Sequence, residues 1–137
     1  MPLPDLTQQY HTTNLVVRCS DFRLRNHIED WIDKTLETAD ELVGLGAGLI
    51  LLREGRAQAA LEDIRALRQL HGFSDVWFIF HTGCGAYKHF RGGTTPELER
   101  AAQLEDVEAI EKIMADEGLK PHFLLMKPSG QFIPFEA

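Results

Sequence analysis

The chain has 137 residues, of which 44% are hydrophobic and 26% are charged. This composition is typical of one globular domain and argues against a disordered protein. Acidic residues outnumber basic ones by 21 to 14, for a net charge of −7. We therefore expect no nucleic-acid partner, because such interfaces need clustered Lys and Arg.

Two further features bound the class of protein. The longest apolar stretch, residues 42–52, contains several glycines and is too short to span a bilayer. Residues 1–9 show no basic segment followed by an apolar core, so we expect no secretory signal, no membrane partner and a cytoplasmic location. Only two cysteines are present, Cys19 and Cys84, which excludes a disulfide scaffold.

The first half of the chain predicts a short polar arm followed by alternating strands and helices. The arm covers residues 1–12, and we expect residues 13–137 to form one domain. Residues 14–18 are apolar and β-branched and predict a buried strand that ends at Cys19. Residues 24–38 predict an amphipathic helix. A flexible glycine-rich turn is expected at residues 44–48, and a short buried strand at residues 49–52.

The second half continues the alternation. Residues 56–71 predict a helix that Gly72 ends, because glycine is favoured just past a helix C-terminus. Residues 75–80 are almost all apolar or aromatic and predict the strongest strand. An acidic helix at residues 96–116 follows, and strands at residues 123–126 and 132–135 flank a turn and pair antiparallel. The alternation indicates an α/β fold around a mostly parallel sheet.

Chemically reactive side chains follow two of the predicted strands. Cys19 ends the first strand, and His81 and Cys84 follow the strongest one. In open parallel sheets, ligands bind at the carboxyl ends of the strands. Two cysteines and one histidine form a known ligand set for catalytic zinc, and Gly83 allows a tight turn between His81 and Cys84.

Two other interpretations of the cysteines stay open at this point. A buried cysteine commonly serves as a small hydrophobic residue. The pair could also be redox-active, although the expected compartment is reducing and the two residues are 65 positions apart in the sequence.

The two motifs together resemble those of the β-class carbonic anhydrases. Cys19-Ser20-Asp21-Phe22-Arg23 matches the pattern C-x-D-x-R, and His81-Thr82-Gly83-Cys84 matches H-x-x-C. The order of the strands, the glycine-rich turn and the closing strand–turn–strand extend the resemblance over residues 13–135. Either motif alone would be weak, whereas both in this order are a specific signal.

The resemblance implies a fold, a metal site and an activity. It implies four parallel strands plus a fifth antiparallel strand, with helices on both faces, assembled as a homodimer or a dimer of dimers. Cys19, His81 and Cys84 would bind Zn²⁺. Asp21 and Arg23 would form the catalytic pair, with Asp21 as a fourth zinc ligand in a closed state. The activity would be reversible hydration of carbon dioxide to bicarbonate.

The chemistry of zinc agrees with this implication. Zinc lowers the pKa of a bound water to about 7, so hydroxide forms near neutral pH. Asp21, paired with Arg23, would orient that water. The residues expected to line the substrate pocket are Phe22, Gly46, Phe80 and Tyr87. None of the other histidines is placed by the sequence as a proton shuttle.

Departures from the family pattern leave alternatives open. Only about 12 residues precede the first strand, where the family has helices that contact the partner subunit. Phe22 replaces a small residue, and Leu45-Gly46-Ala47-Gly48 stands where Arg-Asn-Ala-Gly is common. One alternative is therefore a hydrolase of carbonyl sulfide or carbon disulfide at the same zinc site. Another is a non-catalytic zinc module in which Asp21 closes the fourth position.

Overall fold

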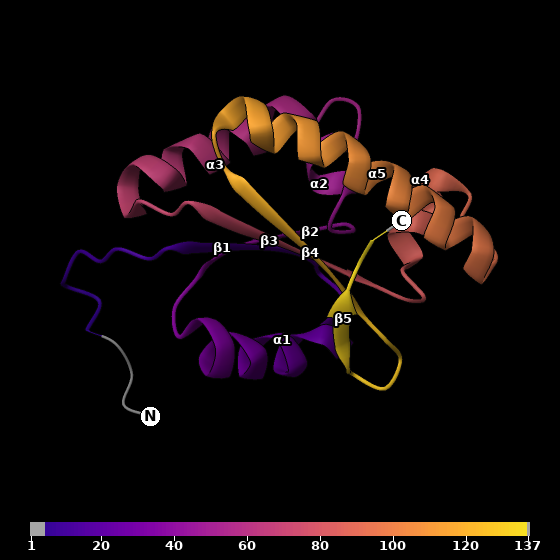
Figure 1. Ribbon diagram of the computed structural model, residues 1–137, viewed down its shortest axis with the longest axis horizontal. Helices are drawn as coiled ribbons and strands as arrows, with labels where there is room; N and C mark the ends of the chain where they lie inside the picture. The colour runs from indigo at the N-terminus through magenta and orange to yellow at the C-terminus, as the bar shows by residue number, and fades with distance from the viewer. Residues whose placement is uncertain (1–4, 137) are drawn as a thin grey trace.

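Apolar runs of the sequence form the centre of a five-stranded sheet (Figure 1). The computed structural model describes residues 5–136. The strands are β1 Asn14–Cys19, β2 Asp40–Gly44, β3 Asp75–His81, β4 Lys120–Met126 and β5 Phe132–Pro134. Their order is β2-β1-β3-β4-β5, with parallel pairing throughout except for the antiparallel pair β4–β5. The predicted α/β class, with four parallel strands and a fifth antiparallel one, is confirmed.

Helices cover both faces of this sheet, as Figure 1 shows. One face carries α1 Arg25–Trp31, which a 3-10 turn at Phe22–Leu24 precedes and a π-helical turn at Ile32–Leu36 follows. The other face carries α2, α3 and α5. The bounds of the remaining helices are α2 Leu49–Leu52, α3 Ala57–His71, α4 Gly85–Arg91 and α5 Pro96–Glu117. Within residues 5–136, none of the helices has the length and apolarity needed to cross a bilayer.

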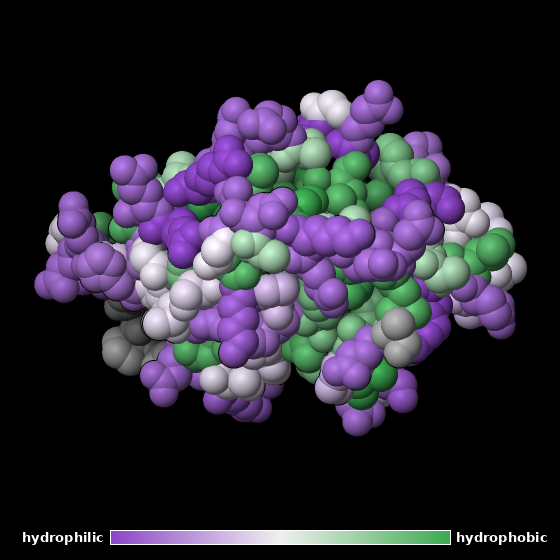
Figure 2. All heavy atoms as spheres, turned by 45° about the horizontal axis from the view of Figure 1, so that its top comes forward, coloured by the Kyte–Doolittle hydropathy of each residue, from purple (hydrophilic) through white to green (hydrophobic). Residues whose placement is uncertain are grey.

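The central strands β1 and β3 are largely buried because helices pack against both of their sides. Leu15, Val16 and Val17 of β1 are inaccessible to solvent, and so are Phe78 and Ile79 of β3. This explains why both strands are continuous apolar runs instead of alternating ones. The exposed side of the helical layer is mainly hydrophilic (Figure 2), as the acidic pattern of residues 96–116 predicts.

One segment of the prediction was wrong. Residues 49–52 form the short helix α2, and the strand next to β1 is Asp40–Gly44. A run of four apolar residues cannot distinguish a strand from a buried helical turn by periodicity. The strand β2 escaped detection because it is an edge strand that begins with two acidic residues, and its one buried residue is the acidic Asp40.

Two other elements differ from the expectation in extent. The short helix α4 was not predicted, although it directly follows Cys84. Strand β4 begins at Lys120, three residues earlier than expected. Pro121 is tolerated there because β5 pairs only with Leu124–Met126, so the N-terminal part of β4 is a free edge, where a missing N–H costs little.

Candidate metal centre

The two cysteines and His81 come together at the carboxyl end of the sheet. Cys19 is the last residue of β1, and His81 is the last residue of the neighbouring parallel strand β3. Cys84 lies three residues later, as the N-cap of α4. The three ligand atoms all lie within 4.8 Å of one another, and all three residues are buried.

The distances between these atoms fit a tetrahedral metal ion. The Sγ atoms of Cys19 and Cys84 are 3.9 Å apart. Two thiolates bound to one tetrahedral Zn²⁺ at about 2.3 Å would be separated by about 3.8 Å. The free state of both cysteines agrees with a ligand role.

The hydrogen bonding of the His81 imidazole is also compatible with metal binding through Nε2. Its Nδ1 lies 3.2 Å from the carbonyl oxygen of Thr82, an arrangement in which Nδ1–H donates and Nε2 keeps its lone pair. Nε2 is buried and has no hydrogen-bond partner among residues 5–136. Buried polar atoms are rarely left unsatisfied. The free lone pair of this nitrogen is therefore consistent with binding of a metal ion such as Zn²⁺, which imidazole binds well.

The two thiols share one hydrogen bond, and it affects them in opposite directions. The hydrogen bond between the two sulfur atoms lowers the pKa of Cys19. The same contact, together with burial, raises the pKa of Cys84. One thiolate therefore forms easily, whereas the second needs a nearby cation, which a divalent metal supplies.

Asp21 and Arg23 form a bidentate ion pair beside this cluster. The Arg23 Nε atom donates to both carboxylate oxygens of Asp21 at 3.0 Å, and Nη2 donates to Oδ2 at 2.5 Å. The hydrogen bonds from Arg23 lower the pKa of Asp21 to about 2. Arg23 also lies 3.5 Å from the carbonyl oxygen of Gly83. The pair thus connects the first motif to the turn of the second motif.

The four residues expected in a substrate pocket lie in two different environments. Phe80 and Tyr87 are buried, with ring centroids 6.2 Å apart. Gly46 packs closely against Tyr87, since a Cβ atom at this position would lie 3.3 Å from the Tyr87 ring. Phe22, in contrast, is 81% exposed.

A buried polar network lies behind these residues. The carboxylate of Asp106 on α5 accepts a hydrogen bond from Tyr87 Oη at 2.7 Å and forms an ion pair with Arg91 of α4. Gly48 approaches this network so closely that a Cβ atom would lie 2.3 Å from Tyr87 Oη. Glycine at position 48 therefore permits the packing of the glycine-rich turn against α4 and α5.

Sequence reasoning missed Glu99 and Gln103 of α5. The Glu99 carboxylate accepts hydrogen bonds from the backbone N–H groups of Gly83, at 2.9 Å, and Cys84, at 2.8 Å. Gln103 Nε2 donates to the carbonyl oxygen of His81 at 3.1 Å. Glu99 was expected on a solvated acidic face and Gln103 was not singled out, yet both are buried. Their helical spacing with the buried Ile110 places them on the buried face of α5 and could have revealed them.

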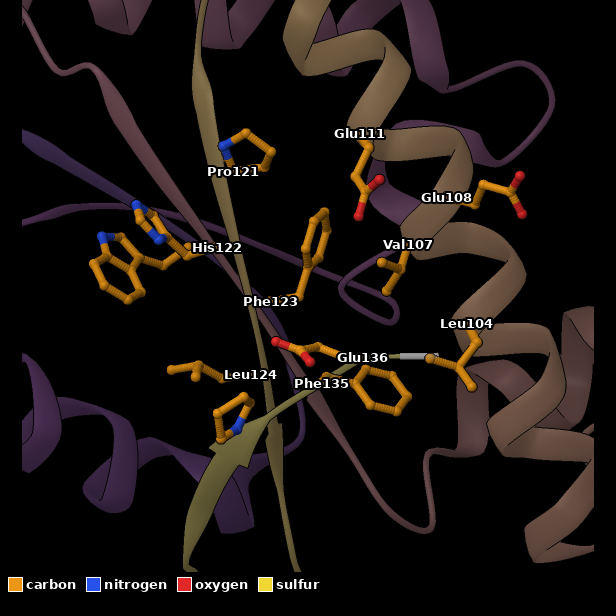
Figure 3. Close-up of a pocket in the computed structure, with 12 residues that line it drawn as sticks. Leu104, Val107, Glu108, Glu111, Pro121, His122, Phe123, Leu124, Phe135 and Glu136 are labelled. Carbon is orange, nitrogen blue, oxygen red and sulfur yellow. The ribbon is translucent and has the colours of Figure 1, made fainter.

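Two cavities of the molecule differ in whether they adjoin the cluster of Cys19, His81 and Cys84. A cavity of about 250 Å³ adjoins the turn from His81 to Cys84, called the ligand turn below. It is lined by Thr82, Lys88, Thr95 and Glu99 among others. A larger one, about 550 Å³, lies at β4 and α5 and is lined by Val107, Glu111 and Phe123 among others (Figure 3). The lining of this larger cavity includes none of Cys19, His81 and Cys84, whereas Cys84 lines the smaller one.

Comparison of the fold with solved structures identifies its class. A β-carbonic anhydrase of Trichomonas vaginalis is similar with a TM-score of 0.59 at 18% identity, over 98% of this chain and 88% of that one. A carbonic anhydrase of Glaciozyma antarctica gives 0.56 at 16%, over 98% and 85%. The apo form of a carbon disulfide hydrolase gives 0.54 at 13%, over 94% and 82%. The chain has the β-carbonic anhydrase fold, with a strongly diverged sequence.

Sequence comparison gives a nearer relative. An uncharacterized protein of Rickettsia bellii (strain RML369-C) is 31% identical over 128 residues, which cover 86% of this chain and 78% of that protein. No family model matches the chain. The chain belongs to the same family as the Rickettsia protein.

Proposed function

We propose that this protein is a zinc-dependent carbonic anhydrase that hydrates carbon dioxide reversibly to bicarbonate, with Cys19, His81 and Cys84 as the zinc ligands. The observation that carries the proposal is the buried cluster of these residues, in which His81 Nε2 has no partner among residues 5–136, directly beside the Asp21–Arg23 pair. When bound, zinc would supply a Lewis acid that makes water nucleophilic near neutral pH.

The residues of the chain would orient the reaction. Asp21 stays ionised throughout the neutral range because Arg23 holds its pKa at about 2. A carboxylate in that state only accepts hydrogen bonds, so Asp21 would fix the direction of a water proton. Both oxygens of Asp21 are engaged by Arg23, which favours this orienting role over ligation of the metal by Asp21.

The test is stopped-flow hydration of carbon dioxide by the zinc-loaded protein. The assay belongs at about pH 8.5, above the pKa near 7 that zinc gives to bound water. We expect a rate well above that of buffer, with loss of the rate in metal-depleted protein and in Cys84→Ser. A zinc-loaded protein with no rate above buffer would contradict the proposal.

A hydrolase of carbonyl sulfide or carbon disulfide is the second candidate at the same site. The exposed Phe22 beside Asp21 favours it, because a large side chain at this position alters the approach to the centre. The fold of this chain is similar to that of the carbon disulfide hydrolase almost as closely as it is to those of the anhydrases. Release of hydrogen sulfide from either substrate, without carbon dioxide hydration, would favour it.

We further propose that the chain acts as a cytoplasmic homodimer or larger homo-oligomer. Three apolar side chains at this end of the sheet are exposed in the single chain, namely Phe22, Val43 and Leu45. Solved structures of this fold include two tetrameric β-carbonic anhydrases of Sordaria macrospora. Sedimentation velocity tests the assembly, and a monomer at all concentrations would contradict it.

A further inference from the structure

Helix α5 contacts both ends of the segment that carries two of the proposed ligands. Glu99 holds the N–H groups of Gly83 and Cys84, and Gln103, one turn further along the helix, holds the carbonyl group of His81. The residues are four positions apart and so lie on the same face of the helix. The ligand turn from His81 to Cys84 is therefore fastened at its beginning and at its end.

The contact of Glu99 is the more informative of the two. Its two oxygens accept hydrogen bonds from two successive backbone N–H groups, so the carboxylate fixes the orientation of the peptide planes on either side of Gly83. Gly83 has a φ of +76°, a conformation with no strong preference of its own in glycine. The direction in which the Cys84 side chain leaves the turn thus depends on an external restraint.

Close packing keeps Glu99 in this place. A Cβ atom at Gly93 would lie 3.1 Å from the Cα of Glu99, so the helix start and the loop before it are in contact. The helix begins at Pro96, after a Thr95 cap that accepts a hydrogen bond from Leu98 N–H. Glu99 forms no salt bridge with any residue of the range 5–136. Its charge is therefore directed at the ligand turn alone.

We propose that Glu99 is a positioning residue of the metal centre, which acts by holding the turn between His81 and Cys84, with Gln103 as its partner at the other end. The proposal rests on the proposed role of His81 and Cys84 as metal ligands, but not on the identity of the substrate. Residues of this kind, which orient ligands without touching the metal, commonly change metal affinity by about 10–100-fold when they are replaced.

The substitution Glu99→Gln tests this directly, because glutamine has the same shape but only one acceptor oxygen. Its NH₂ group would face a backbone N–H group, so one of the two hydrogen bonds is lost. Glu97→Gln is the matched control, since Glu97 is exposed in the same first turn. The second variant, Gln103→Met, keeps the side-chain length and removes the donor to His81.

The measurement is titration of metal-depleted full-length protein with Co²⁺, followed by the thiolate-to-cobalt absorption band. We expect Glu99→Gln to weaken Co²⁺ binding by about 10–100-fold and to shift or weaken the band, while Glu97→Gln behaves like the wild type. Gln103→Met should weaken binding in the same direction, and it provides the answer if Glu99→Gln does not fold.

The outcomes separate this inference from the proposed function. If the wild type binds Co²⁺ with a thiolate band and both variants bind it with the same affinity and spectrum, Glu99 and Gln103 are merely structural and the inference is wrong. If circular dichroism shows reduced stability of the metal-free variants without a change in Co²⁺ affinity, the inference is wrong in the same way. If the wild type itself binds no Co²⁺, the proposed metal site fails.

Discussion

Gly48→Ala is expected to destabilise the protein although its backbone conformation suits alanine. Gly48 has φ −73° and ψ −34°, which any residue adopts easily. The obstacle is space, because the new Cβ atom would lie 2.3 Å from Tyr87 Oη and 3.1 Å from Asp106 Cβ. To make room, Tyr87 must move away from Asp106, which breaks a buried hydrogen bond of 2.7 Å.

The magnitude follows from three contributions. Overpacking of a dense site costs about 1–3 kcal/mol, and a buried hydrogen-bonding group left unsatisfied costs about 1–3 kcal/mol. Reduced entropy of the unfolded chain returns about 0.4–1 kcal/mol. We therefore expect the free energy of unfolding to fall by about 2–4 kcal/mol, with a fall in Tm of roughly 10 °C.

Urea unfolding followed by circular dichroism measures this loss. Gly85→Ala is the matched control, because a Cβ atom at Gly85 would meet no atom of the described part of the chain within 4 Å, and it should leave the stability nearly unchanged. In a Tyr87→Phe background the hydroxyl group that causes the clash is absent, so Gly48→Ala should cost less there. A cost below about 0.5 kcal/mol, or an equal cost in both backgrounds, would refute the reasoning.

Three further changes give distinct expected results. Asp21→Asn should lower the hydration rate by about 10²–10⁴-fold and leave the zinc content unchanged; loss of zinc would instead identify Asp21 as a ligand. The hydrogen bond from His122 lowers the pKa of Asp75. Ionised Asp75 therefore stabilises the fold above its unfolded pKa of about 3.9, and this stabilisation is lost as the pH falls through the lower pKa of the folded state. The urea midpoint of Asp75→Asn should therefore lie below that of the wild type at about pH 5.5 and approach it at more acidic pH, and a gap independent of pH would contradict this. Zinc at about 100 times its Kd should stabilise metal-depleted wild type by about 2.7 kcal/mol in thermal unfolding but not Cys84→Ser, and equal shifts would argue against this site.

The sequence predicted the parts of the fold whose signals are local. The buried runs at β1 and β3 and the helical periodicity of α3 are complete in themselves. The convergence of Cys19 with His81 followed from the geometry of parallel strands. The edge strand β2 was missed because Asp40 and Glu41 interrupt its apolar pattern, although its backbone pairs fully with β1.

The remaining part of the site depends on contacts between distant segments. Only its helical spacing to the buried Ile110 distinguishes Glu99 from the exposed Glu97, and that spacing does not identify what the carboxylate contacts. Its role depends on the approach of α5 to the turn at Gly83, sixteen residues away in the sequence. Likewise, the exposure of Phe22 follows from how η1 (Phe22–Leu24) leaves the end of β1, which periodicity does not reveal.

The most direct test of the central claim is the zinc content of the purified wild type and of Cys19→Ser, measured side by side by mass spectrometry of the metal. If Cys19, His81 and Cys84 hold the ion, the wild type contains about one zinc per chain. The variant lacks one of the two thiolates and contains almost no zinc, while its far-UV circular dichroism stays that of a folded protein. A folded Cys19→Ser variant that retains a full equivalent of zinc would contradict the account.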